Sequence, residues 1–242
     1  LIARGEKLHQ LAIKSSQKTV THLAKRRTKT VPLVITHCTK RKRVAAAEEL
    51  QAHRLPAGTT TQVASDWAAR LVASSPALQA KDLYAGRGMV EARRAAQAMN
   101  GRLAIISAGI GLVDGDTLVP GYSLTTIGGD PDDIRRKTGA GRADWWPAIQ
   151  AASPFAQSDR GPRGLILAAV SAAYLEMVAT EWSAWPTADL DRLRLFSKVA
   201  PGPAAEALRA AWMPYDDRLD GVSQGLAGTQ GDFAQRAMRH FA

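Results

Sequence analysis

The chain has 242 residues, of which 45% are hydrophobic and 22% are charged, and its formal net charge is +10. Its single cysteine excludes an intramolecular disulfide framework and a cysteine-rich zinc site, and is typical of a protein of the reducing cytoplasm. No apolar run reaches the roughly 20 residues that a membrane-spanning helix needs. We therefore expect a cytoplasmic protein with no membrane partner, built as one large domain or as a domain with a small appendage.

The excess positive charge lies at the start of the sequence. Residues 1–43 hold twelve of the 32 Lys and Arg residues and only one of the 22 acidic residues. Apolar residues recur at a spacing of three or four before Pro32, so we interpret residues 1–30 as a basic helical arm and residues 31–242 as one α/β domain. Such an arm is typical of a protein that binds DNA, because Lys and Arg release condensed counterions from phosphates. A helix that only increases solubility is the alternative. The candidate DNA contacts within the arm are Lys25, Arg26 and Arg27.

The remaining sequence alternates between strand and helix patterns. The apolar run at 32–37 is typical of a strand that is buried on both faces. Further strands are predicted at 102–108, 164–171 and 192–198, and helices at 62–74, 80–99, 172–185, 203–212 and 229–242. Residues 128–144 are predicted to form a loop. The alternation predicts a three-layer α/β/α sandwich with a mainly parallel sheet of about four strands.

In an open parallel sheet, ligands bind beyond the carboxyl ends of the strands. This rule selects the residues that directly follow each predicted strand: His37, Cys38, Thr39 and Lys40; Ser107, Gly109 and Gly111; Ser171 and Tyr174; Ser197 and Lys198. Successive residues of a strand point to opposite faces, so His37 and Cys38 are not expected to act as a pair. A buried structural role is the alternative for Cys38, and a tight strand exit is the alternative for the glycines.

Four consecutive cations follow the first strand, and we interpret them as contacts to DNA phosphates. They are Lys40, Arg41, Lys42 and Arg43.

Two further stretches hold candidate site residues. In "KDLYAGRG", Tyr84 and Arg87 are expected to share a helix face, where they could stack on a base and pair with a phosphate. Asp82 could either be catalytic or favour the start of that helix. In "DGDTLVPGYSLT", Asp114 could be catalytic or could form a turn, and Tyr122 follows in the same loop.

The sequence lacks several motifs that would indicate a cofactor or a metal. It has no Walker A loop, no dinucleotide-binding GxGxxG, no HExxH and no GxSxG. Five histidines and one cysteine, scattered along the chain, do not predict a metal site. We therefore expect no cofactor and no bound metal.

Four short motifs resemble those of a widespread bacterial domain related to the uracil-DNA-glycosylase-like fold, a fold also suspected in archaeosine-synthase proteins. They are "THCTK" at 36–40, "KDLY" at 81–84, "IISAGIGLV" at 105–113 and "PGY" at 120–122. The sequence lacks the water-activating and leucine loops of uracil glycosylases. Ile110 stands where an aromatic residue is usual, and Gly121 separates Pro120 from Tyr122. The remaining similarity is to bacterial anti-phage DNA glycosylases that excise glucosylated hydroxymethylcytosine.

This resemblance implies an enzyme that flips a modified base out of double-stranded phage DNA and leaves an abasic site. The transition state would resemble an oxocarbenium ion, which a carboxylate stabilises, and Asp82 or Asp114 is the candidate for that role. The remaining pocket candidates are His37, Cys38, Tyr84, Ser107, Gly109 and Tyr122. A non-catalytic nucleic-acid-binding module and a nucleotide- or nucleobase-processing enzyme are the alternatives.

Overall fold

The computed structural model describes residues 30–161 and 163–242. The predicted basic arm, with Lys25, Arg26 and Arg27, lies outside the described residues. The compact unit considered below spans Val31–Ala242.

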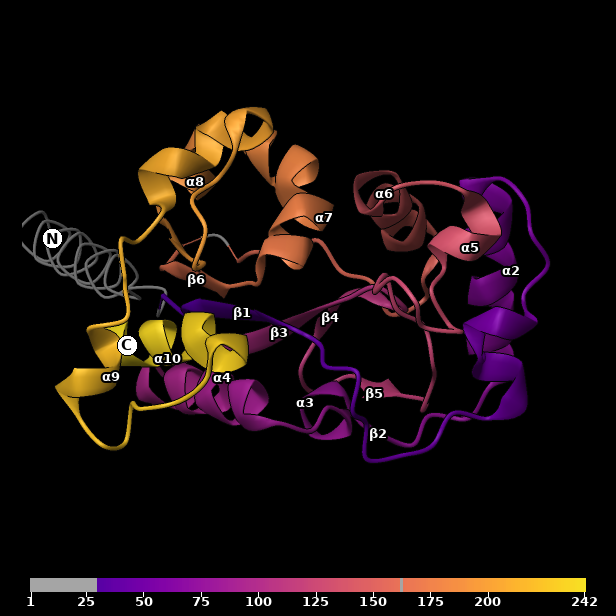
Figure 1. Cartoon of the computed structure of the whole chain (residues 1–242), viewed down its shortest axis with the longest axis horizontal. Coiled ribbons are helices and arrows are strands. Elements are labelled where there is room, and N and C mark those ends of the chain that lie inside the picture. Colours follow the sequence, from indigo (N-terminus) through magenta and orange to yellow (C-terminus); the bar gives the residue numbers. More distant parts are fainter. Residues whose placement is uncertain (1–29, 162) are drawn as a thin grey trace, which may run out of the picture. The chain divides into compact units, whose positions relative to one another are not determined.

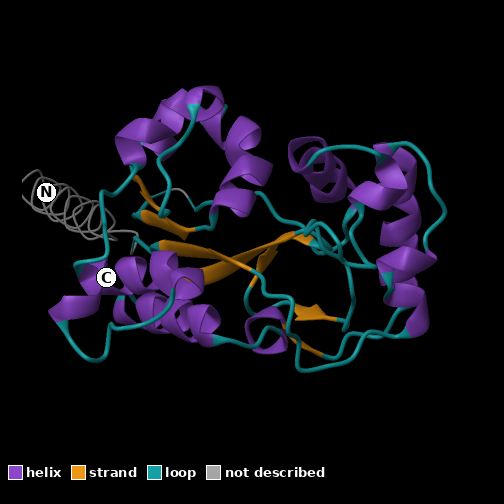
Figure 2. Cartoon of the chain, viewed as in Figure 1, coloured by secondary structure: helices purple, strands orange, loops and turns teal. Residues whose placement is uncertain are grey.

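A five-stranded sheet forms the centre of this unit (Figure 2). Its strand order is β4-β3-β1-β6-β7. Strands β3, β1, β6 and β7 are parallel to one another, whereas the edge strand β4 is antiparallel to β3. The strand bounds are β1 Leu33–His37, β3 Arg102–Ser107, β4 Gly111–Asp114, β6 Ile166–Ala169 and β7 Leu193–Phe196. The predicted α/β class and mainly parallel sheet are thus confirmed, with β4 as an additional strand.

Both faces of the sheet are covered by helices, because the strands are apolar on both sides. Val34 of β1 belongs to an apolar cluster with α4 and α10, whereas Leu33 and Ile35 belong to a second cluster with α2, α6 and α7. In Figure 1, α4 and α10 lie below the sheet and α7 lies above it. The helix bounds are α2 Thr60–Ala73, α4 Arg87–Ala98, α6 Arg142–Ala152, α7 Ala172–Ser183 and α10 Phe233–Phe241.

Short elements connect this framework. A small two-stranded sheet pairs β2 (Leu78–Gln79) with β5 (Leu118–Val119). The short α-helices are α3 Ala80–Leu83, α5 Arg135–Thr138, α8 Thr187–Leu190 and α9 Leu219–Val222. The 3-10 helices are η1 Glu48–Leu50, η2 Ala52–Arg54, η3 Pro203–Ala211 and η4 Gln230–Asp232.

The order of connections places a crevice between two central strands. From β1 the chain passes through α4 to β3 on one side, whereas from β6 it passes through α7 to β7 on the other. The two helices pack on opposite faces, so the chain diverges at the carboxyl ends of β1 and β6. Such a switch point is where open α/β sheets bind their ligands.

Three predicted elements differ from the structure. The loop predicted over 128–144 contains α5 and the start of α6. The helix predicted over 80–99 is divided into α3 and α4, because Tyr84 is extended after the end of α3 and Gly86, with a φ of 126°, precedes the start of α4. Tyr84 and Arg87 therefore do not share a helix face. The glycine-rich segment that was expected to end the second strand instead turns directly into β4, and Gly111, with a φ of 76°, permits the tight turn.

No helix within the described residues is long and apolar enough to cross a membrane.

The turn between β3 and β4 is buried in the core, and its residues line none of the three pockets described below. Trp67 Nε1 donates to the carbonyl of Gly109 at 2.6 Å, and Trp145 Nε1 donates to that of Ala108 at 2.7 Å. The Tyr122 ring lies so close to Gly109 that an added Cβ would be 2.8 Å from Cδ2. The interpretation of this glycine as a tight strand exit therefore fits the structure. The absence of a side chain at Gly109 leaves room for the Tyr122 ring.

We expect Gly109→Ala to destabilise the protein by about 1–3 kcal/mol, the usual cost of overpacking a core. The new methyl group would overlap the Tyr122 ring. Gly202→Ala is the matched control, because its added Cβ would meet no atom within 4 Å. Urea unfolding of both variants measures the effect, and equal midpoints would contradict the proposed packing of Tyr122.

Candidate functional site

A pocket of about 260 Å³ lies at the switch point. We call it the switch-point pocket. Three segments line it: the chain after β1, the loop 123–130, and the start of α7 after β6. Its lining residues are His37, Cys38, Thr39, Lys40, Lys42, Ser123, Leu124, Thr125, Thr126, Ile127, Asp130, Ser171, Ala173 and Tyr174.

One wall of the pocket is formed by His37 and Tyr174. Their rings stack with centroids 4.5 Å apart and an interplanar angle of 13°. The Tyr174 hydroxyl also lies 2.9 Å from the Cys38 Sγ. Consecutive residues thus contact the same side chain, because β1 ends at His37 and the strand alternation ends with it.

The ionisation of His37 follows from its surroundings. Burial lowers its pKa, and a hydrogen bond to the carbonyl of Cys38 opposes this only in part. The Nδ1 atom lies 3.0 Å from that carbonyl oxygen. Because a carbonyl only accepts, Nδ1 carries the proton and Nε2 keeps its lone pair. At neutral pH, His37 is therefore a neutral imidazole that can accept a proton at Nε2.

Beneath the pocket, three hydroxyl side chains form a buried chain. The Tyr84 and Tyr122 hydroxyls are 2.7 Å apart, and the Tyr122 hydroxyl also pairs with Ser107 Oγ. Burial raises the pKa of both tyrosines, so both stay protonated at neutral pH. These residues do not line the pocket themselves. They pack beneath Lys42, whose Nζ lies 4.3 Å from the centroid of the Tyr122 ring.

An ion pair closes the outer side of the pocket. Lys40 Nζ lies 2.5 Å from Asp130 Oδ2, and the side chain of Lys40 is 73% exposed whereas that of Asp130 is 8% exposed. The hydrogen bond from Lys40 lowers the pKa of Asp130, so this carboxylate stays ionised. Asp132 anchors the same loop through Ser123 and through the backbone and ring of His53.

The structure brings together the predicted site residues that follow the first strand. His37, Cys38, Lys40 and Lys42 all line the switch-point pocket. The side chains of Arg41 and Arg43 are exposed beside it. The segment that carries them is extended alongside α3: the Arg43 N–H donates to Leu83 and the Ala85 N–H donates to Arg41.

The two predicted catalytic carboxylates lie elsewhere. Asp82 is 44% exposed and pairs with Arg93 at 3.0 Å. Asp114 ends β4, whose antiparallel direction places it beside Ala104 near the start of β3, and it pairs with Arg102 at 3.4 Å. Neither residue lines the switch-point pocket. Their positions agree with the structural alternatives for these residues. Asp82 lies in the short helix α3, and Asp114 begins a turn in which it accepts a hydrogen bond from the Asp116 N–H.

Arg87 lines a separate hollow of about 200 Å³ at the starts of α4 and α10. Its Nε lies 3.3 Å from Asp232, a carboxylate that Arg236 also binds at 2.8 Å. His37 and Thr39 line both this hollow and the switch-point pocket. Arg87 is therefore neutralised in the structure, unlike Arg41 and Arg43, for which no ion pair is formed within the described part of the chain.

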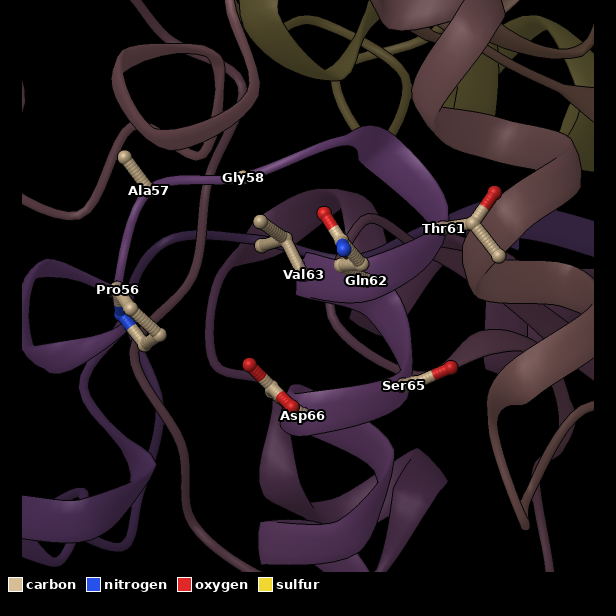
Figure 3. A pocket seen from close by; sticks show the side chains of 8 residues that line it. All are labelled: Pro56, Ala57, Gly58, Thr61, Gln62, Val63, Ser65 and Asp66. Carbon is tan, nitrogen blue, oxygen red and sulfur yellow. The ribbon is translucent and has the colours of Figure 1, made fainter.

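A larger hollow of about 440 Å³ lies at the start of α2 (Figure 3). None of its lining residues directly follows a strand of the central sheet, and Asp66 is the single charged side chain among them. Gln62, which is labelled in Figure 3, is already bound to Thr59 in the capping box of α2. The lining residues are Pro56, Ala57, Gly58, Thr61, Gln62, Val63, Ser65 and Asp66. Size alone thus does not identify the site, since this hollow has no convergent set of reactive groups.

Among the residues that the structure describes, no group of three or more His, Cys, Asp or Glu side chains is placed to hold a metal ion.

No protein-family model, curated protein or solved structure matches the chain. The resemblance to glycosylase-like domains therefore stays a prediction that rests on short sequence motifs.

Tyr174 and Asp130, which both line the pocket, differ in whether the sequence alone could identify them. Tyr174 is among the residues that follow the third strand, so the strand-end rule selects it. Asp130 lies in a Gly- and Asp-rich stretch with no distinguishing pattern. Only the path of the loop brings it to Lys40.

We expect the free energy of unfolding to fall as the pH decreases below about 6.5, the ordinary pKa of histidine. The folded-state pKa of His37 is lowered, so the unfolded chain binds the proton more tightly, and stability rises with pH between the two pKa values. This one group contributes at most about 1.4 kcal/mol per pH unit.

Urea unfolding at pH 5.5 and 7.5 tests this expectation. His37→Phe keeps a ring against Tyr174 and should reduce the difference between the two pH values. The difference measured for the wild-type protein at the same two pH values is the reference. An unchanged difference in His37→Phe would show that His37 does not titrate as described.

Proposed function

We propose that this protein is a DNA glycosylase that excises a modified base, with glucosylated hydroxymethylcytosine of phage DNA as the candidate, and that it acts in anti-phage defence. The observation that carries the proposal is the switch-point pocket, which combines a stacked aromatic wall, an ionised carboxylate and, beside it, two exposed arginines that form no ion pair within the described residues. Helices on both faces of the sheet are compatible with the three-layer α/β/α sandwich of glycosylase-like domains.

Each part of the pocket suits one step of base excision. The exposed side chains of Arg41 and Arg43 suit contacts to phosphates on either side of the target nucleotide. A flipped base needs a pocket with a flat apolar wall and polar groups for its edge. The pair of His37 and Tyr174 supplies the first, and the hydroxyls of Ser123 and Thr125 in the loop 123–130 supply the second.

The chemistry follows from the charges that line the pocket. Cleavage of the N-glycosidic bond develops positive charge on the sugar, which a nearby carboxylate stabilises. In this proposal Asp130 takes the role that the sequence assigned to Asp82 or Asp114, because Asp130 is the carboxylate that lines the pocket. The neutral imidazole of His37 accepts a proton from the attacking water at Nε2. No cofactor takes part in this scheme.

We expect Asp130→Asn to lower the single-turnover rate of base release by roughly 10²-fold or more, because the stabilising charge is lost. Asparagine keeps the acceptor for the Asp132 N–H, which preserves the loop. Asp82→Asn and Asp114→Asn are the matched controls, since each also removes one carboxylate from an ion pair. Alkali-labile sites in modified and plain phage DNA measure the reaction.

The outcomes of this experiment separate the candidate functions. Loss of activity in Asp82→Asn or Asp114→Asn, with Asp130→Asn unaffected, would mean that the switch-point pocket is not the reaction site. If no DNA yields abasic sites but binding persists, the protein is a nucleic-acid-binding module.

We expect the double variant Arg41→Ala/Arg43→Ala to weaken DNA binding and to reduce the salt dependence of the affinity. Each lost phosphate contact lowers the slope of log K against log salt by about 0.9. Arg163→Ala/Arg194→Ala removes the same charge near the amino ends of β6 and β7, at the opposite edge of the sheet. Equal losses in the two double variants would contradict a binding surface at the carboxyl edge.

A further inference from the structure

Lys42 differs from the cations beside it. The side chains of Lys40, Arg41 and Arg43 are exposed, whereas that of Lys42 is half-buried. The cause is an isolated β-bridge that pairs Lys42 with Tyr84. In an extended segment, successive side chains point to opposite sides. Arg41 and Arg43 therefore point outward, and Lys42 points back into the switch-point pocket.

Within residues 30–161 and 163–242, the amine of Lys42 has no carboxylate partner. No acidic oxygen of the described residues lies within ion-pair distance of it, because Asp130 is engaged by Lys40. Its nearest aromatic neighbours are the rings of Tyr122 and Tyr84, whose centroids lie 4.3 and 5.9 Å from Nζ. The Lys42 amine thus faces the pocket with aromatic rings, and no carboxylate of the described residues, as its close neighbours.

The groups around this amine act on its pKa in opposite directions. Burial lowers the pKa of Lys42 and is the largest effect, while the charges of Cys38, Asp132 and Asp130 oppose it. The pKa remains below that of a free lysine. The neutral, nucleophilic amine is therefore more populated than in an exposed side chain, the condition that imine-forming lysines exploit.

We propose that Lys42 is an imine-forming amine, and that it reacts with the C1′ aldehyde of an abasic site in the switch-point pocket. The identity of this substrate rests on the proposed glycosylase function, because base excision produces that aldehyde. The protein would then also cleave the DNA strand after removing the base.

The reaction balances without an oxidant or a cofactor. The Lys42 Nζ adds to the aldehyde carbon of the ring-opened sugar, and water leaves to give a protonated imine. A base removes a proton from C2′, and the C3′–O bond breaks with its electron pair going to the departing phosphate. His37 is the neutral base that lines the same pocket. Hydrolysis of the imine then releases the unsaturated sugar fragment and restores the amine.

Reductive trapping on DNA with a preformed abasic site tests the proposal without requiring base excision. The full-length protein is incubated with this DNA and sodium cyanoborohydride, which converts an imine into a stable secondary amine. We expect a covalent protein–DNA complex on a denaturing gel, with the modification located at Lys42 by peptide mass spectrometry. Lys42→Arg keeps the positive charge and should reduce the complex by at least about 10-fold, because a guanidinium does not form an imine.

Two further measurements keep the test decisive. Lys81→Arg is the control variant, because Lys81 pairs with Asp116 and does not line the pocket, and it should trap like the wild type. Thermal unfolding verifies that Lys42→Arg is folded. Undiminished trapping in Lys42→Arg, modification of other lysines, or no complex with the wild-type protein would each overturn the proposal. Base release from modified DNA without trapping would support the glycosylase function and reject the imine chemistry of Lys42. Trapping without base release would support the imine chemistry and reject the glycosylase function.

Discussion

The divergence of the chain at the carboxyl ends of β1 and β6 is the constraint on which the rest of this structure depends. Because α4 and α7 pack on opposite faces of the sheet, neither fills the space above these two strands. The loop 123–130 covers that space without closing it, and Asp132 ties the loop to the 3-10 helix η2 through His53. The position of every proposed reactive group follows from this arrangement.

The pocket separates exposed charge from buried neutral groups. Arg41 and Arg43 face solvent, where phosphates can reach them, while the interior holds a neutral imidazole and tyrosines whose pKa values burial raises. Lys42 lies at the boundary between the two environments. In the proposed function, the exposed rim binds a polyanion and the buried neutral groups transfer protons inside the pocket.

The sequence was informative where local patterns determine structure. The apolar run at 32–37 and three similar runs predicted the parallel strands, and the strand-end rule then placed His37, Cys38 and the following cations at the carboxyl edge of the sheet, where they lie in the structure. It failed where long-range packing decides. The hairpin into β4, which removes Asp114 from that edge, depends on a positive φ at Gly111, and the contact of Asp130 with Lys40 depends on the path of a loop. Neither leaves a periodic signal in the sequence.

The central claim is that a modified nucleotide enters the pocket between β1 and β6. A structure of the protein bound to DNA that contains a non-hydrolysable 2′-fluoro analogue of the modified nucleotide tests this claim most directly. The account predicts an extrahelical base against Tyr174 and under the loop 123–130, with backbone phosphates beside Arg41 and Arg43. A base that remains stacked in the duplex, or one bound in the hollow at the start of α2, would contradict it.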